Sequence, residues 1–220
     1  MKKIVLAAML MLSVAGAGWS FDPDNLNKVT ITNSTTDDIQ YLFAKAEDAG
    51  VWGADILGAS NTLSPGNSHS FNILYINESA RFTFLAIDVN DVSYQISDVT
   101  ITDGTEVNLK FAAKNKISTK FDFTFTTVEL TNTLDYDINY IFFSPSESDH
   151  WGADVMDAET ILKKGTTASF LVPVKAREIK YNVMCADEDN DTYSFNVNLS
   201  NKKDTHAYDI EASDLDTDDD

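Results

Sequence analysis

The chain has 220 residues, with 35 aspartates and glutamates against 16 lysines and arginines, and its formal net charge is −19 at pH 7. Such a charge repels phosphate backbones and anionic lipid surfaces, so the composition argues against nucleic acid as a partner. Cys185 is the only cysteine, so no disulfide can form within the chain and the fold must rely on its core. Tyr181 and Val183 alternate with Cys185, which predicts an inert thiol on the buried face of a strand.

Residues 1–20 have the layout of a bacterial secretory signal peptide. Two lysines precede an apolar run from Ile4 to Val14, and small residues follow, so we expect cleavage after Ala17 or Ser20. The run is shorter than the about 20 residues that span a bilayer, and no later stretch of the sequence is apolar enough for a transmembrane segment. We therefore expect an exported protein that resides in a periplasm or outside the cell.

The rest of the chain repeats itself at an offset of 99 residues, which relates Trp-Gly-Ala-Asp at 52–55 to the same tetrapeptide at 151–154. A register held over this length predicts an internal duplication. We expect repeat units at 26–112 and 125–212, a linker at 113–124 and a disordered acidic tail at 213–220. The same offset, without a gap, pairs Thr32-Asn33 with Thr131-Asn132, Tyr41 with Tyr140, Leu63 with Leu162, Gly66 with Gly165, Asp88 with Asp187 and Tyr94 with Tyr193.

Within each unit, apolar and polar residues alternate along short stretches, which is typical of strands with one buried face. Turns are predicted at Pro65-Gly66 and Lys164-Gly165, and a tight acidic turn joins two strands of each unit into a hairpin. These features predict an all-β fold of two tandem immunoglobulin-like β-sandwich domains, without the Cys…Trp…Cys spacing of antibody domains. The predicted strands are 28–35, 38–44, 69–75, 81–88, 92–97 and 105–111, then 137–143, 168–174, 180–187, 192–198 and 205–211.

The repeated Trp-Gly-Ala-Asp lies in a long connection between two strands of each unit. In the second unit, Ser148 or Asp149 is a candidate cap for a short helix that begins near His150 and carries Asp154 in its first turn. Trp151 would then pin the connection over one end of the sandwich. The alternative is a ligand platform made of exposed tryptophans, with Trp52, Asp55, Trp151 and Asp154 as binding residues.

The second unit resembles a small domain found in exported bacterial proteins. The resemblance rests on a strand with the pattern I-x-Y-[IL], a Ser-Pro-Ser, a W-G-x-D, an L-x-x-G turn and a closing hairpin with D-x-D-[GN]-x-x-Y. The first unit follows this pattern less closely, with "AKAEDAG" in place of "SPSESDH". The resemblance implies a secreted repeat module and no particular activity.

The acidic hairpin of the second unit is a candidate calcium site. Asp187, Asp189 and Asp191 have the i, i+2, i+4 spacing of calcium-binding loops, but the glycine and the distal glutamate of an EF-hand are missing. The alternative is a plain turn, because aspartate and asparagine hydrogen-bond their own backbone in hairpins. Ca²⁺ is therefore the one cofactor that the sequence suggests.

The inventory of reactive residues argues against an enzyme. No histidine is repeated, since the offset of 99 residues relates His69, His150 and His206 to Ala168, Val51 and Val107. We therefore expect a non-catalytic exported binding or structural module that recognises an unknown protein or a component of the cell envelope. The first alternative is a carbohydrate-binding module that stacks sugars on its loop tryptophans. The second is a glycan-acting enzyme that uses the repeated carboxylates Asp55/Asp154 and Asp88/Asp187.

Overall fold

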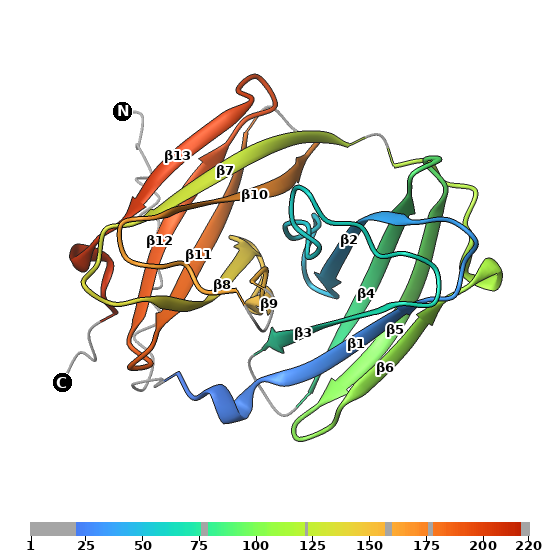
Figure 1. Cartoon of the computed structure of the whole chain (residues 1–220), viewed down its shortest axis with the longest axis horizontal. Helices are drawn as coiled ribbons and strands as arrows, with labels where there is room; N and C mark the ends of the chain where they lie inside the picture. Colours follow the sequence, from blue (N-terminus) through green and yellow to red (C-terminus); the bar gives the residue numbers. More distant parts are fainter. Residues whose placement is uncertain (1–20, 76–78, 122, 157–159, 176–177, 217–220) are drawn as a thin grey trace, which may run out of the picture.

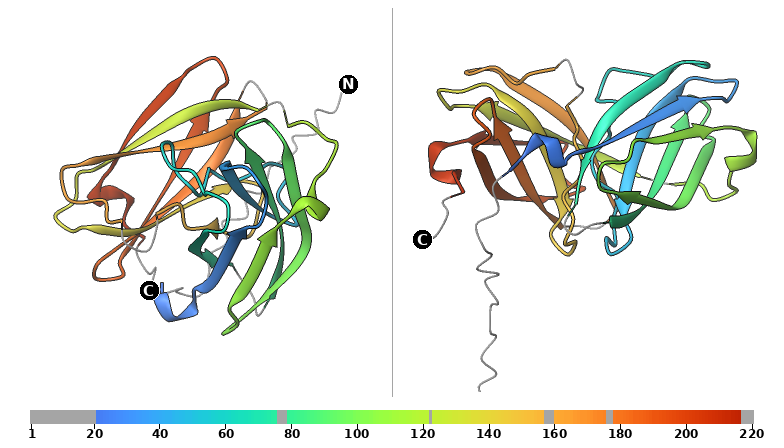
Figure 2. Two further views of the ribbon diagram at one scale, coloured as in Figure 1. Left: turned by 45° about the vertical axis from the view of Figure 1, so that its right-hand side comes forward. Right: turned by 90° about the horizontal axis from the view of Figure 1, so that it is seen from below.

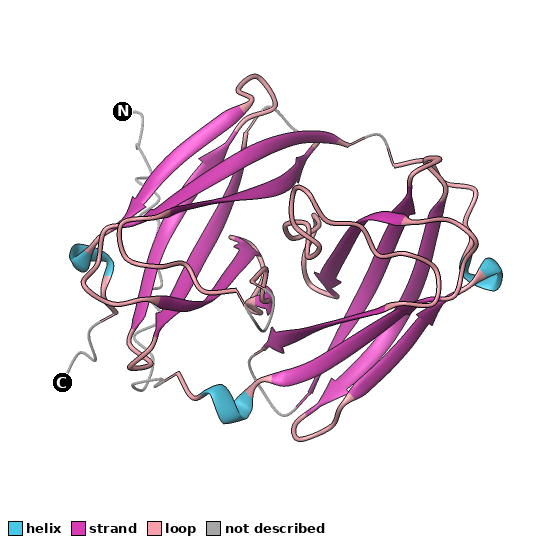
Figure 3. Ribbon diagram, in the orientation of Figure 1, coloured by secondary structure: helices cyan, strands magenta, loops and turns pink. Residues whose placement is uncertain are grey.

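A computed structural model describes residues 21–75, 79–121, 123–156, 160–175 and 178–216. The predicted signal peptide at 1–20 lies outside the described residues. The all-β prediction is confirmed: strands and three short 3₁₀-helices make up the secondary structure of the described ranges (Figure 3). No helix in this part of the chain is long and apolar enough to cross a membrane.

The first half of the chain forms two sheets that enclose one core. In one sheet β1 lies between antiparallel β3 and parallel β6, and in the other β4 lies between β2 and β5 in antiparallel order. Val29 and Ile31 of β1 are fully buried and alternate with less buried polar residues, as the sequence pattern predicts. The strands are β1 (Asn27–Asn33), β2 (Ile39–Ala46), β3 (Ser68–Leu74), β4 (Ser79–Asp88), β5 (Ser93–Thr102) and β6 (Val107–Phe111).

The second half has the same pairings. β7 lies between antiparallel β10 and parallel β13, and β11 lies between β8 and β12 in antiparallel order. Figure 1 shows the two halves side by side, and Figure 2 shows the two sheets of each half facing each other. The strands are β7 (Thr124–Asn132), β8 (Ile138–Pro145), β9 (Gly152–Ala153), β10 (Thr167–Val174), β11 (Ile179–Asp187), β12 (Thr192–Leu199) and β13 (Thr205–Ile210). Cys185 of β11 is fully buried, and this burial raises the pKa of its thiol.

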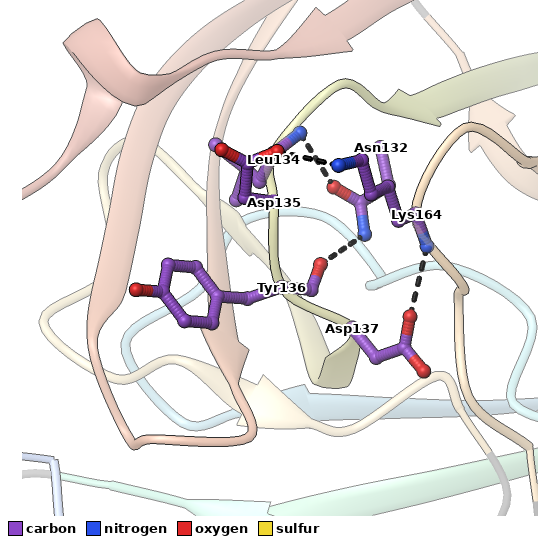
Figure 4. A network of polar contacts seen from close by, with 6 residues as sticks. All are labelled: Asn132, Leu134, Asp135, Tyr136, Asp137 and Lys164. Atoms are coloured by element: carbon purple, nitrogen blue, oxygen red, sulfur yellow. Dashed lines mark hydrogen bonds and ion pairs between the residues drawn. The ribbon is translucent and has the colours of Figure 1, made fainter.

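A buried asparagine ends the first strand of each half. The side-chain amide of Asn132 donates to the carbonyl oxygen of Tyr136 (2.8 Å), and its Oδ1 accepts from the amide of Leu134 (Figure 4). The same side-chain amide also donates to the carbonyl oxygen of Leu162 (3.0 Å). Asn33 repeats both donations, to residues 37 and 63. The paired asparagines in the sequence therefore close equivalent turns.

The equivalence of the halves continues beyond the predicted unit ends at 112 and 212. The 3₁₀-helices η2 (Ala113–Asn115) and η3 (Ala212–Asp214) are followed by Lys116 and Leu215, which form β-bridges with Tyr94 and Tyr193. Residues 213–216, expected to be disordered, are held by these contacts and by a bond from Ser194 Oγ to Asp216. The rest of the acidic tail, 217–220, lies outside the described residues.

The segments that lead into β1 and β7 each pack on a sheet of the opposite half of the chain. Phe123, from the predicted linker, and Phe125, at the beginning of β7, pack on β2 at the face turned away from the core. Phe21, which directly follows the predicted signal peptide, packs on Tyr140 and Phe142 of β8. Phe121 and Phe123 of the predicted linker are therefore part of the packed structure.

Candidate functional site

The two Trp-Gly-Ala-Asp loops join the halves of the chain. Gly152 and Ala153 form the short strand β9, which extends the first-half sheet by pairing antiparallel with β3. The amide of Asp154 donates to Asn72 of that strand at 2.9 Å, and the amide of Asp55 donates to Leu171 of β10 at 2.8 Å. Each loop therefore bonds to the edge of a sheet in the other half.

The helix expected near His150 is therefore not formed. Ser148 does accept a hydrogen bond from the amide of His150 at 3.1 Å, but the chain then runs extended. The free edge of β3 supplies the backbone partners that a helix would otherwise provide, and an edge strand favours such pairing. Gly152 makes the turn into this strand with a φ of +84°, a conformation that glycine adopts without steric cost.

The alanine of each loop lies in the core of the other half. Ala54 is buried in the second-half core beside Val172, and Ala153 is buried in the first-half core beside Ile73. The hydroxyl of Tyr181 adds a bond across the junction by donating to the carbonyl oxygen of Trp52 at 2.9 Å.

The aspartate of each loop turns its carboxylate back to its own half. Asp55 Oδ1 accepts from the amides of Leu42 (2.9 Å) and Leu57 (3.3 Å), and Asp154 Oδ1 accepts from Ile141 (3.1 Å) and Met156 (3.0 Å). Both aspartates are buried, and Asp55 Oδ2 has no hydrogen-bond partner among the described residues. Burial raises the pKa of the Asp55 carboxyl to about 7, although the two amides act in the opposite direction.

The tryptophans lie against the outer sheet faces. Trp52 is 7% exposed and packs with Phe43, Leu85 and the edge of Phe121, whereas Trp151 is half-buried beside Phe142. Both rings pack against neighbouring side chains, and Oδ1 of Asp55 and of Asp154 accepts hydrogen bonds from backbone amides. The four residues predicted to bind a ligand are thus divided between two loops whose contacts are internal to the chain.

The acidic hairpin holds its first aspartate inside the turn. Asp187 is fully buried, its Oδ1 accepts from the amides of Asp189 (2.9 Å) and Asp191 (3.0 Å), and its Oδ2 accepts from the hydroxyl of Tyr193 (3.0 Å). Asp88 has the same three kinds of contact in the first half. Asp189 and Asp191 are exposed, and no group of three His, Cys, Asp or Glu side chains in the described ranges is arranged to hold a metal ion. A calcium site here stays a prediction.

A groove lies at the junction of the halves, beside Trp52. We call it the aromatic groove; it has a volume of about 270 Å³. Lys45 Nζ lies 5.4 Å from the centre of the Trp52 ring, and Lys175 Nζ lies 5.3 and 5.1 Å from the rings of Phe121 and Phe123. These distances are those of cation–π contacts. The lining residues are Lys45, Gly50, Val51, Trp52, Thr83, Gln95, Phe121, Phe123, Pro173 and Lys175.

The aromatic groove was missed by sequence reasoning, apart from Trp52. Its lining comes from a loop, four strands and the segment that leads into β7, and its lysines come from different halves, so no local pattern contains it. One signal was available: Phe121, Phe123 and Phe125 alternate as in a strand with one apolar face, which is unusual for a spacer.

A scan against protein families found no match, and no curated protein matches the chain. Among solved structures, the chain is similar to a carbohydrate-binding module of family CBM26 from Eubacterium rectale Amy13K, solved in complex with maltoheptaose. The two are 11% identical, the likeness covers 83% of this chain and 90% of that chain, and the TM-score is 0.23. At that score the likeness carries no argument about this chain.

Proposed function

We propose that the chain is a non-catalytic, exported binding module that arose by internal duplication of a β-sandwich unit, and that its ligand site is the aromatic groove. The observation that carries this proposal is the convergence of three aromatic rings and two lysines on one hollow at the junction of the halves. Concave sites with apolar walls and a few placed polar groups are where small ligands bind.

The duplication is supported by equivalent contacts in the two halves. The strand pairings of β1 and β7 match, as do the bonds of Asn33 and Asn132 and the buried carboxylates of Asp55 and Asp154. Export is supported by the sequence of residues 1–20 alone.

The non-catalytic assignment is supported by the state of the repeated carboxylates. A glycoside hydrolase needs two carboxyl groups that face a substrate. Asp55 and Asp154 are buried and accept backbone amides, and Asp88 and Asp187 cap hairpins. None of the four opens toward the aromatic groove, whose described lining contains no carboxylate.

A saccharide is the second candidate ligand, beside an unknown protein or another component of the cell envelope. The aromatic lining favours it, because sugar rings present an apolar face that packs on aromatic side chains. The sugar would bind in the groove that Trp52 borders. The alternative drawn from the sequence placed it instead on two exposed loop tryptophans.

The test is affinity electrophoresis of the purified protein through gels that contain soluble envelope polysaccharides, compared for wild type, F123A and F195A. Phe195 is a half-buried phenylalanine of β12, outside the groove, so F195A is the matched control. We expect F123A to lose at least about tenfold in affinity and F195A to bind like wild type. Equal retardation of all three proteins would contradict the assignment of the site to the groove.

A further inference from the structure

We infer that the aromatic groove takes an anionic ligand, a saccharide that carries carboxylate or sulfate groups on its rings. This inference rests on the proposed function and names the ligand class of the same site. It starts from an imbalance: the chain has 35 acidic and 16 basic side chains, yet the described lining of the groove includes two lysines and no aspartate or glutamate.

The positions of the two ammonium groups decide between neutral and anionic ligands. Lys45 Nζ lies over Trp52, and Lys175 Nζ lies over Phe121 and Phe123. The ring faces that a neutral sugar would stack on are therefore already covered by positive charge. An anion bound in the groove gains charge-assisted hydrogen bonds from these ammonium groups without displacing them from the rings.

The lysines carry no ion pair that competes with a ligand in the described part of the chain. The salt bridges there join Arg81 to Glu47 and Lys164 to Asp135. Lys45 belongs to β2 and is half-buried, whereas Lys175 directly follows β10 and is exposed. Two cations from opposite halves thus face one hollow, which fits a ligand that bridges the junction.

The remaining lining suits a ring that carries an acidic group. Gln95 and Thr83 offer neutral hydrogen-bonding groups, and the rings of Phe121 and Phe123 are stacked at 5.3 Å with an interplanar angle of 28°. A volume of about 270 Å³ lies at the small end for ligand sites, so the groove has room for a ring or two of a longer chain.

The same rings border a second hollow. It has a volume of about 650 Å³ and is lined in part by Tyr41, Lys120 and Phe125. Asp91 is the only carboxylate in its described lining, and Lys120 offsets that charge. A saccharide that continues past Phe121 and Phe123 would therefore find aromatic rings and a further lysine on the far side.

Isothermal titration of the purified protein with three probes tests the inference: an oligogalacturonate (carboxylate), a low-mass dextran sulfate (sulfate) and a neutral dextran oligosaccharide. The variants are K45Q/K175Q, F123A and the matched control K202Q/K203Q, which changes two exposed lysines of the β12–β13 turn. We expect one or both anionic probes to bind in low salt and to weaken as salt is added, because these contacts are screened. K45Q/K175Q should bind about tenfold or more weakly, with K202Q/K203Q unchanged.

The outcomes separate the inference from the proposed function. Binding of oligogalacturonate alone or of dextran sulfate alone identifies the acidic group. Binding of neutral dextran that is lost in F123A but kept in K45Q/K175Q would overturn the anionic ligand and leave the groove as the site. Anion binding that neither K45Q/K175Q nor F123A weakens would overturn both. The absence of binding by all three probes would overturn the anionic saccharide and leave the proposed function to be tested with other ligands.

Discussion

The amide of Asp154 donates a 2.9 Å hydrogen bond to the carbonyl oxygen of Asn72, a residue 82 positions earlier in the chain and in the other half of the molecule. The amide of Asp55 has the reciprocal bond to Leu171. The repeated Trp-Gly-Ala-Asp is thus explained residue by residue: the tryptophan packs on the outer sheet of its own half, the alanine enters the other core, and the aspartate bonds to both halves.

The stability of the protein should depend on pH through Asp55. Its carboxyl has a pKa of about 7 in the folded state against an ordinary value of 3.8, so the folded state binds more protons between these values. The free energy of unfolding should therefore fall as pH rises from about 4 to about 7 and level off above that. The upper limit is on the order of 4 kcal/mol, at about 1.4 kcal/mol per pH unit.

Urea denaturation at several pH values, followed by fluorescence of Trp52 and Trp151, measures this dependence. In D55N the decrease in the free energy of unfolding between pH 4 and 7 should disappear. The neutral amide keeps an acceptor for the amides of Leu42 and Leu57 and has no proton to lose. D209N removes an exposed charge on β13 and should keep the slope of wild type. A slope that is the same in D55N and D209N would show that other groups cause it.

Phe21 should anchor the beginning of the chain. It is 4% exposed and packs on Tyr140 and Phe142, so F21A leaves a cavity and should lower the free energy of unfolding by about 3 kcal/mol. The matched control is I161A, since Ile161 is 47% exposed and its loss should cost less than about 0.5 kcal/mol. Equal effects of the two changes in thermal unfolding would mean that Phe21 does not pack as described.

The glycines of the two loops should respond differently to alanine. Gly152 has a φ of +84°, so G152A should cost about 1 kcal/mol even though nothing lies within 4 Å of the added Cβ. At Gly53 the added Cβ would lie 3.4 Å from the carbonyl oxygen of Ala44 without a left-handed φ, so G53A should cost clearly less. Chemical denaturation of both variants checks the order, and a larger loss in G53A would contradict it.

Calcium should change the melting temperature little. Both carboxylate oxygens of Asp187 already accept hydrogen bonds within the hairpin, so a Ca²⁺ ion would have to compete with three donors for this ligand. We expect equal melting temperatures in EDTA and in millimolar calcium for wild type and for D189N. A rise in calcium that D189N abolishes would establish the calcium site that the sequence spacing suggests, because a ligand of the folded state raises its stability.

The strands were predictable because their signal is local. Alternation such as Val29 and Ile31 in β1 depends only on one face being buried, and the offset of 99 residues marks equivalent turns, as at Asn33 and Asn132. The calcium prediction drew on the same kind of local spacing, which a hydrogen-bonded turn at Asp187 also satisfies.

The junction of the halves and the aromatic groove were not predictable, because the residues that form them are distant in the chain. A short helix from His150 was a reasonable expectation for a segment with a capping serine, but the edge of β3 offers the same backbone bonds. Lys45 and Lys175 have no sequence pattern in common, and they meet only after the halves have docked. Tertiary contacts of this kind override local propensity.

Native-state amide hydrogen exchange at Asp55 and Asp154 is the most direct test of the central claim, that the Trp-Gly-Ala-Asp loops join the halves by backbone hydrogen bonds to β3 and β10. Both amides donate across the junction, so they should exchange as slowly as amides in the middle of β3 and β10, and only when the halves separate or unfold. Slow exchange at both positions is the predicted result. Fast exchange at both, with β3 and β10 still protected, would show that the loops are not bonded across the junction and would return them to the list of candidate ligand sites.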